Sequence, residues 1–169
     1  MAVIGVGYWG RNHVRVLYEV ERAELKAVCD VNPERAKWIS ISYRVPYFIS
    51  SKELLKDDSI EAVTICTWPT VLAKEAKKAL EAGKHVLVEK PMATSSKEAQ
   101  DLMKLAEKKD LILMVSFIER FNLSINYVRE LIPLASCRSP SQPTDLEALE
   151  KIDLRKSSGE LSELEALRR

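Results

Sequence analysis

One lysine of this chain stands where the sequence predicts the end of a β-strand. Residues 83–93 read GKHVLVEKPMA, so an apolar run leads directly into Glu89, Lys90 and Pro91. A lysine amine can take up a hydroxyl proton where burial or nearby charge favours its neutral form. On residue chemistry alone, a lysine that ends a strand is usually a solvated surface residue, and it is the full run over residues 83–93 that favours a functional role. We take Lys90 as the candidate proton acceptor, Glu89 as a residue that orients the loop or pairs with it, and Pro91 as a candidate cis proline.

A glycine-rich segment near the N-terminus predicts a nucleotide site. It reads GVGYWG over residues 5–10, after a short apolar run and before a helical pattern. In a dinucleotide-binding fold, Gly5 forms the tight turn, Gly7 admits the pyrophosphate and Gly10 lets the helix pack against the sheet. The backbone amides of residues 8–10 would then face the phosphates from a helix N-terminus. The segment by itself also fits folds that bind another adenosyl ligand, such as a methyl donor.

An acid follows at the spacing that dinucleotide binding requires. Asp30 closes the second apolar run, 20 residues after Gly10. Its carboxylate would accept hydrogen bonds from the adenosine ribose and repel a 2′-phosphate, which favours NAD over NADP. The alternative is a solvated acid beside the helix that Asn32 caps. Arg35 would stack on adenine or shift the preference toward NADP. The sequence therefore predicts NAD as the cofactor and leaves NADP open.

The elements that would position these residues alternate between strand and helix. Helical spacing follows the glycine turn, Asn32 and Pro33 begin a second helix, and Gly83 ends a later one. This order predicts an α/β fold with a doubly wound, mostly parallel sheet of the Rossmann type. Strands are expected at 2–4, 24–30, 46–48, 62–66, 85–89 and 111–115, and helices at 10–19, from 33, and at 51–56, 71–82 and 95–109.

Composition narrows the class of protein further. The chain has 169 residues, 46% hydrophobic and 30% charged, with a net charge of +1. These values fit a globular protein and give no reason to expect nucleic acid or a membrane as partner, so we expect a cytoplasmic protein. The cysteines Cys29, Cys66 and Cys137 lack metal-binding spacing, and no metal site is predicted. The two histidines, His13 and His85, are expected to be structural.

Taken together, the glycine turn, Asp30 and the Glu-Lys-Pro run resemble the glucose–fructose oxidoreductase, inositol dehydrogenase and MocA family of NAD(P)-dependent sugar oxidoreductases. The resemblance covers residues 2–132. It implies that Lys90 reaches the substrate hydroxyl beside the nicotinamide, and that residues 67–70 contact the nicotinamide ribose. Family members often carry a histidine just beyond that loop, where this chain has Ala73. The residues thus expected to bind the cofactor are Gly5, Gly7, Tyr8, Trp9, Gly10, Asp30, Arg35, Thr67, Trp68, Pro69, Glu89 and Lys90.

The resemblance fades toward the C-terminus. Residues 117–122 are most similar to the entry into the second domain in the branch that acts on nucleotide-linked amino sugars. Leu123 replaces the proline that this branch often has next. Beyond the breaker-rich stretch that begins at Pro133, no strand pattern is present. We expect a dinucleotide-binding domain over residues 1–133 and a mainly helical tail over 134–169, with apolar residues at helical spacing (Leu146, Leu149, Ile152, Leu161, Leu164 and Leu167).

The family pattern implies an NAD(P)-binding domain that serves hydride transfer to or from a sugar or nucleotide-sugar hydroxyl. Without a substrate domain such a chain would be incomplete for catalysis, as a product of a frameshift or early stop would be. One alternative is a non-catalytic NAD-binding sensor or partner subunit that docks another chain through its tail helices and an exposed apolar face over residues 117–132. This exposed face would be formed by Phe117, Phe121, Tyr127, Val128 and Leu131. Another alternative is a dehydrogenase completed by a partner chain.

Overall fold

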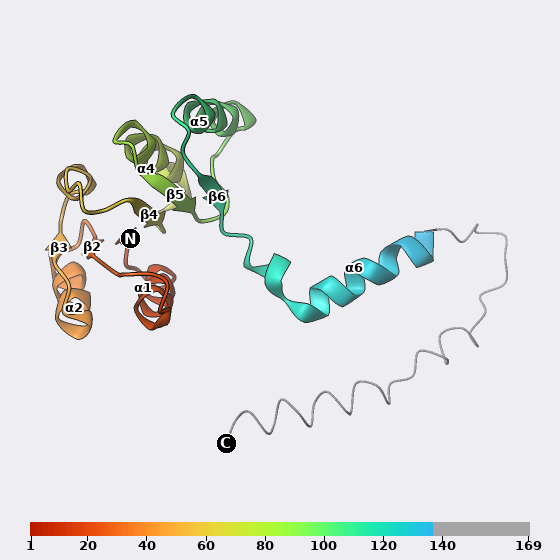
Figure 1. Ribbon diagram of the computed structural model, residues 1–169, viewed down its shortest axis with the longest axis horizontal. Coiled ribbons are helices and arrows are strands. Elements are labelled where there is room, and N and C mark those ends of the chain that lie inside the picture. The colour runs from red at the N-terminus through yellow and green to blue at the C-terminus, as the bar shows by residue number, and fades with distance from the viewer. Residues whose placement is uncertain (137–169) are drawn as a thin grey trace, which may run out of the picture. The chain divides into compact units, whose positions relative to one another are not determined.

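The computed structural model describes residues 1–136 and confirms the alternation of strands and helices. Figure 1 labels the elements along the chain. They are β1 (Ala2–Ile4), α1 (Gly10–Glu19), β2 (Ala27–Cys29), α2 (Pro33–Tyr43), β3 (Tyr47–Phe48), α3 (Ser51–Leu54), β4 (Ala62–Ile65), α4 (Pro69–Glu81), β5 (His85–Val88), α5 (Ser96–Lys108), β6 (Leu113–Val115), the 3-10 helix η1 (Ile118–Phe121) and α6 (Leu123–Ser136).

The six strands form one sheet in the order β3-β2-β1-β4-β5-β6, and every pairing between neighbours is parallel. The chain builds outward from β1 to β3 and then returns to β1's other side to add β4, β5 and β6. The strand order therefore reverses between β1 and β4. In open sheets of this kind, ligands bind at the carboxyl ends of the strands beside such a reversal. The predicted doubly wound sheet is confirmed.

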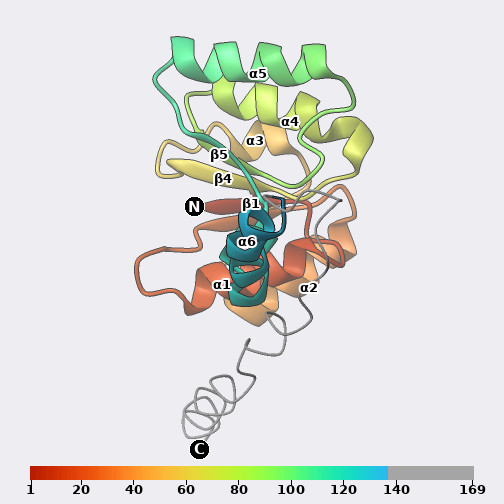
Figure 2. The same ribbon diagram turned by 90° about the vertical axis from the view of Figure 1, so that its right-hand side faces the viewer.

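Helices cover both faces of the sheet, with α1 and α2 on one face and α3, α4 and α5 on the other (Figures 1 and 2). Neighbouring residues of a strand point to opposite faces, so Val3 packs toward α1 and Ile4 toward α4. The smaller cluster under α1 and α2 consists of Val3, Val6, Val14, Leu25, Val28 and Ile39. The larger cluster includes Ile4, Leu54, Ile65, Leu72, Leu80, Val88 and Leu102. Burial on both faces explains why the strands read as continuous apolar runs.

Local signals set the helix boundaries. The Asn32 side chain accepts a hydrogen bond from the Arg35 amide at 3.0 Å, which confirms it as the cap of α2. Gly83 has a φ of +77°, the left-handed conformation predicted for it after α4. The second strand is shorter than predicted, because only Ala27–Cys29 pair in the sheet. Residues 24 and 26 instead exchange hydrogen bonds with the backbone of Met1.

The chain divides into two compact units, one over residues 1–118 and one that begins at Glu119. The first holds the whole sheet. In the second, α6 continues three residues past Pro133, where the sequence predicted a break. A proline in a helix removes only one amide donor directly, so a further turn can follow it. The predicted tail helices lie outside the described residues. Over residues 1–136, no helix is long and apolar enough to cross a membrane.

Candidate cofactor-binding site

The three glycines of the N-terminal turn are required for different reasons. Gly5 has a φ of +87°, which side chains rarely adopt. A Cβ added at Gly10 would lie 1.9 Å from the Gly5 carbonyl oxygen, so α1 can begin this close to β1 only at a glycine. A Cβ at Gly7 would meet nothing nearer than the Arg35 Nη1 atom, at 3.9 Å. The protein itself thus requires Gly5 and Gly10, whereas Gly7 leaves open space on the outer side of the turn.

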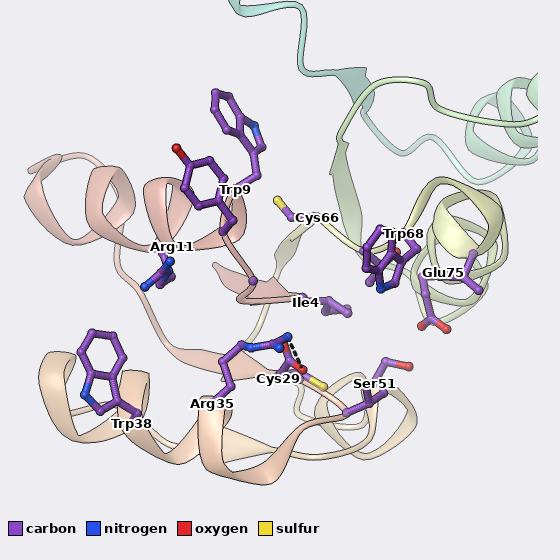
Figure 3. Close-up of a pocket in the computed structure, with 17 residues that line it drawn as sticks. Ile4, Trp9, Arg11, Cys29, Arg35, Trp38, Ser51, Cys66, Trp68 and Glu75 are labelled. Carbon is purple, nitrogen blue, oxygen red and sulfur yellow. Dashed lines mark hydrogen bonds and ion pairs between the residues drawn. The ribbon is translucent and has the colours of Figure 1, made fainter.

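A pocket of about 680 Å³ opens at the carboxyl ends of β1, β2 and β4 (Figure 3). Its position is the strand-order reversal that the fold predicts as the ligand crevice. Residues with predicted cofactor roles supply much of its wall: Gly5, Gly7, Tyr8, Trp9, Asp30, Arg35, Thr67 and Trp68. Gly10, Pro69, Glu89 and Lys90 are absent from that wall, although Gly10 and Pro69 begin the two helices, α1 and α4, that border it.

Asp30 is an anchored acid rather than the solvated one considered from the sequence, because only 5% of its surface is exposed. Its Oδ2 atom accepts the Val6 amide of the glycine turn at 3.0 Å, and Oδ1 accepts the Asn32 amide at 2.9 Å. The Arg35 guanidinium reaches both oxygens at 3.2–3.3 Å and is itself 46% exposed. One carboxylate therefore ties the glycine turn to the end of β2 at the pocket wall.

The loop after β4 forms the opposite wall. Figure 3 shows Trp68 and Arg35 projecting from opposite sides of the pocket, with Ile4 between them. Trp68 is 82% exposed, an unusual state for an indole unless a ligand or partner covers it. The Thr67 hydroxyl is buried and has no hydrogen-bond partner within the described part of the chain. Pro69 follows as the first residue of α4, a favoured place for proline.

Lys90 lies at the carboxyl end of β5, one strand further along the sheet than β4. Its side chain is exposed, and the peptide bond between Lys90 and Pro91 is cis, as predicted. Glu89 precedes it and is only 7% exposed. The Glu89 Oε2 atom accepts the Lys90 backbone amide at 3.2 Å. Of the two predicted uses of Glu89, orienting the loop matches this contact.

The other contacts of Glu89 come from the start of α1. Its Oε1 atom accepts the Trp9 indole N–H at 2.7 Å and lies 2.8 Å from His13 Nε2. The Ser116 hydroxyl, just past β6, also hydrogen-bonds the carboxylate. Burial alone would raise the pKa of Glu89, but the hydrogen bonds from His13, Ser116, Trp9 and the Lys90 amide outweigh it and hold that pKa below its ordinary value. The carboxylate is therefore ionised at neutral pH.

Sequence reasoning missed His13 and the side chain of Trp9 as parts of this site. The available signal was their spacing of four residues at a helix start, which places both side chains on one face. It also missed Val31, which is 90% exposed and lines the pocket. His85 agrees with its structural prediction, because its Nδ1 accepts the Ile112 amide at 3.0 Å.

The cysteines within the described residues are free thiols in apolar surroundings. Burial, with the charge of Asp30 beside Cys29 and of Glu89 beside Cys66, raises the pKa of each thiol to about 12. Neither thiol is then a nucleophile at neutral pH. No group of three or more His, Cys, Asp or Glu side chains able to hold a metal ion occurs within residues 1–136.

These residues fit a dinucleotide. The turn leaves open space at Gly7, residues at the start of α1 line the same pocket, and a buried acid stands at the end of β2. Fold and site together define a Rossmann dinucleotide-binding domain. The family pattern described as "Oxidoreductase family, NAD-binding Rossmann fold" (GFO_IDH_MocA) matches residues 1–117. The chain therefore belongs to the Gfo/Idh/MocA oxidoreductase family, as its sequence predicted.

Comparison with curated proteins agrees with this membership. UDP-N-acetylglucosamine 3-dehydrogenase from Acidithiobacillus ferrooxidans is 34% identical over 128 residues, which are 76% of this chain and 40% of that protein. Inositol 2-dehydrogenase 3 from Saccharopolyspora erythraea is 28% identical over 145 residues, or 83% of this chain and 42% of that protein. The chain thus spans about two-fifths of the length of these relatives.

Solved structures share the fold. The structure of UDP-N-acetylglucosamine 3-dehydrogenase from Acidithiobacillus ferrooxidans superposes with a TM-score of 0.70. The match covers 76% of this chain and 41% of that protein. Scyllo-inositol dehydrogenase from Lactobacillus casei, solved with NAD(H) and scyllo-inositol bound, has a TM-score of 0.73 over 80% of this chain and 41% of its own. Because the sequence identity to this second structure is only 24%, the similarity supports the fold alone.

Proposed function

We propose that this chain is the cofactor-binding part of an oxidoreductase that transfers hydride between a nicotinamide cofactor and the hydroxyl-bearing carbon of a sugar or nucleotide sugar. The observation that carries the proposal is the Asp30 carboxylate. It is buried at the end of β2, bonded to the Val6 amide of an open glycine turn, and exposed to the same pocket as that turn. No packing or capping role inside the domain requires all three features at once.

Within the pocket, the turn amides would hold the pyrophosphate and Asp30 would accept the ribose hydroxyls. An ionised acid at this place disfavours a 2′-phosphate, and Val31 beside it offers no compensating positive charge. Arg35 would provide such a charge, but its guanidinium is engaged with Asp30. These contacts support NAD as the preferred cofactor. Trp68 and the Arg35 guanidinium would cover the adenosine from either side.

At the other end of the site, Lys90 would handle the substrate hydroxyl. When bound, the nicotinamide supplies the acceptor or donor of a hydride. Oxidation of an alcohol carbon also releases the hydroxyl proton, and the Lys90 amine would take it up. The lysine lies at the carboxyl end of β5, the same edge of the sheet at which the pocket opens. Both functions thus belong to one edge of the fold.

The substrate class rests on the relatives. Their names include a UDP-N-acetylglucosamine dehydrogenase and an inositol dehydrogenase, whose substrates are polyhydroxylated rings. We infer a substrate of that class for the whole reaction. The chain spans about two-fifths of the length of these relatives.

Calorimetric titration of the chain with NAD and with NADP tests the cofactor site. We expect NAD to bind more tightly, and Asp30→Ala to weaken NAD by about 10-fold or more, the value of a charged hydrogen bond. Asp58→Ala, which removes an exposed acid, serves as the control and should leave the affinity unchanged. Absence of binding by either dinucleotide, or equal NAD affinity in Asp30→Ala, would contradict the proposal.

A further inference from the structure

A single buried carboxylate joins the glycine turn to the lysine loop. Glu89 follows β5, yet its Oε1 atom is bonded to Trp9 and His13, which lie 80 and 76 residues earlier in the chain. Its Oε2 atom accepts the Lys90 amide, and Ser116 at the end of β6 completes the set. The contacts tie together the beginning of α1 and the ends of β5 and β6.

The charge of Glu89 decides which atoms donate. An ionised carboxylate can only accept hydrogen bonds, and an indole N–H can only donate. The His13 Nε2 atom, 2.8 Å from Oε1, must therefore carry a proton. Trp9 and His13 stand one helical turn apart and reach the same oxygen from one face of the α1 start. This arrangement fixes the direction of the carboxylate, and with it the oxygen that receives the Lys90 amide.

Trp9 belongs to both parts of the site. Its backbone lies in the glycine turn, between Gly7 and Gly10, and the residue is part of the pocket wall. Its indole N–H, in contrast, donates to Glu89. The position of the turn is thereby transmitted to the residue that precedes Lys90. Hydride transfer tolerates displacements of only about 1 Å between reacting groups, so such a rigid connection has a mechanistic use.

We propose that His13 and Trp9 are positioning residues: through the Glu89 carboxylate they fix Lys90 relative to the glycine turn, and so relative to a bound dinucleotide. The inference rests on the proposed function for its link to the cofactor. The hydrogen-bonded set itself can be tested without any cofactor. Neither side chain is placed in contact with substrate, and the device acts through the backbone of residues 89–90.

The first experiment measures hydrogen exchange of single backbone amides in the whole chain without cofactor. His13→Leu removes the donor, and His13→Gln restores an N–H of similar reach. We expect the Lys90 amide to exchange about tenfold faster in His13→Leu than in the wild type, as for loss of one charged hydrogen bond, and to return toward the wild-type rate in His13→Gln. The Glu89 amide bonds the Ile65 carbonyl at 2.9 Å and serves as an internal reference that should not change.

Two further variants keep the test decisive. His85→Leu removes the other histidine, at the opposite end of β5, and controls for general loosening of that strand. Trp9→Phe deletes the indole N–H that donates to Glu89, the other donor named in the proposal, and replaces His13→Leu if that variant does not fold. Equal Lys90 exchange in the wild type and in His13→Leu, or acceleration of the same size in His85→Leu, would overturn the positioning role.

The second experiment introduces the cofactor. Acetylation of Lys90 by an amine-reactive reagent is followed by mass spectrometry with saturating NAD or with ADP-ribose, which lacks the nicotinamide. In the wild type, NAD should slow the acetylation of Lys90 more than ADP-ribose does. This difference should be lost in His13→Leu and regained in His13→Gln, and a difference retained at full size in His13→Leu would overturn the inference.

The two experiments separate the two proposals. If the wild type binds neither NAD nor ADP-ribose, the proposed function fails, and the exchange rates still decide whether His13 positions Lys90. If NAD binds and Asp30→Ala weakens it, while Lys90 is indifferent to His13 in both experiments, the proposed function stands and the positioning inference falls.

Discussion

Asp30 and Glu89 end two strands of the same parallel sheet and are almost equally buried, at 5% and 7% exposed, yet they are held in different ways. Asp30 receives two backbone amides and one half-exposed guanidinium, and it lines the pocket. Glu89 receives an indole, an imidazole, a hydroxyl and one amide, and it lies outside the pocket wall. The first acid faces the pocket, whereas the second joins the elements around it.

The difference shows that burial alone does not distinguish a binding acid from a structural one. What distinguishes the two acids is whether the carboxylate borders the pocket or contacts only other elements of the fold. Asp30 combines its anchoring contacts with a position at the pocket wall. The contacts of Glu89 are instead to side chains of α1, to Ser116 and to the adjacent backbone.

The largest expected effect concerns stability. Glu89→Ala leaves several partly buried donors without an acceptor and should lower the free energy of unfolding by about 3–5 kcal/mol in total. Asp30→Ala should cost about 1–3 kcal/mol, because water can reach the half-exposed Arg35. Urea unfolding followed by circular dichroism measures both. A larger loss of unfolding free energy in Asp30→Ala than in Glu89→Ala would contradict the structural role given to Glu89.

The order should reverse for ligand binding. Asp30→Asn is expected to weaken NAD by about 10-fold, since the ribose loses a charged acceptor. Glu89→Gln should change the NAD dissociation constant by less than about threefold, because its carboxylate lies outside the pocket wall. Calorimetric titration of both variants, at a temperature where each is folded, gives the two constants. A larger loss in Glu89→Gln would mean that this acid belongs to the binding surface.

The loss of stability at low pH should also depend on Glu89. The pKa of Glu89 lies below its ordinary value of 4.5 in the folded chain. Its hydrogen bonds therefore contribute stability above the unfolded pKa, and this contribution is lost as pH falls through the lowered folded pKa. Thermal unfolding between pH 7 and pH 3 should show a smaller acid-induced loss in Glu89→Gln than in the wild type. The matched change Glu19→Gln, at an exposed acid of α1, should retain the wild-type pH dependence.

The smallest effect is expected for Arg35. Its pair with Asp30 is 46% exposed on the arginine side, and such pairs contribute less than about 1 kcal/mol. Arg35→Gln should thus leave the unfolding free energy nearly unchanged, since the backbone amides of Val6 and Asn32 still hold the carboxylate. A loss as large as that of Asp30→Ala would show that the guanidinium, rather than the amides, anchors the acid.

The sequence by itself determined the fold class and the pocket-facing half of the site. Apolar runs, caps and glycines are local signals, read over a few residues, and they are sufficient to order β1, the turn, α1 and β2. The requirement for Gly5 and Gly10 and the place of Asp30 follow from that order. Boundaries were less accurate, as at the second strand and at Pro133, because pairing across the sheet and continuation of a helix depend on neighbours outside the segment.

Only the tertiary structure decided what Glu89 does. Its partners, Trp9 and His13, lie 80 and 76 residues away, and no local pattern connects an acid after β5 with the first turn of α1. The strand order β1-β4-β5, together with the start of α1 at the carboxyl end of β1, brings them within hydrogen-bonding distance. The buried carboxylate stays ionised because those distant donors outweigh the effect of burial, which is a property of the assembled sheet rather than of any segment.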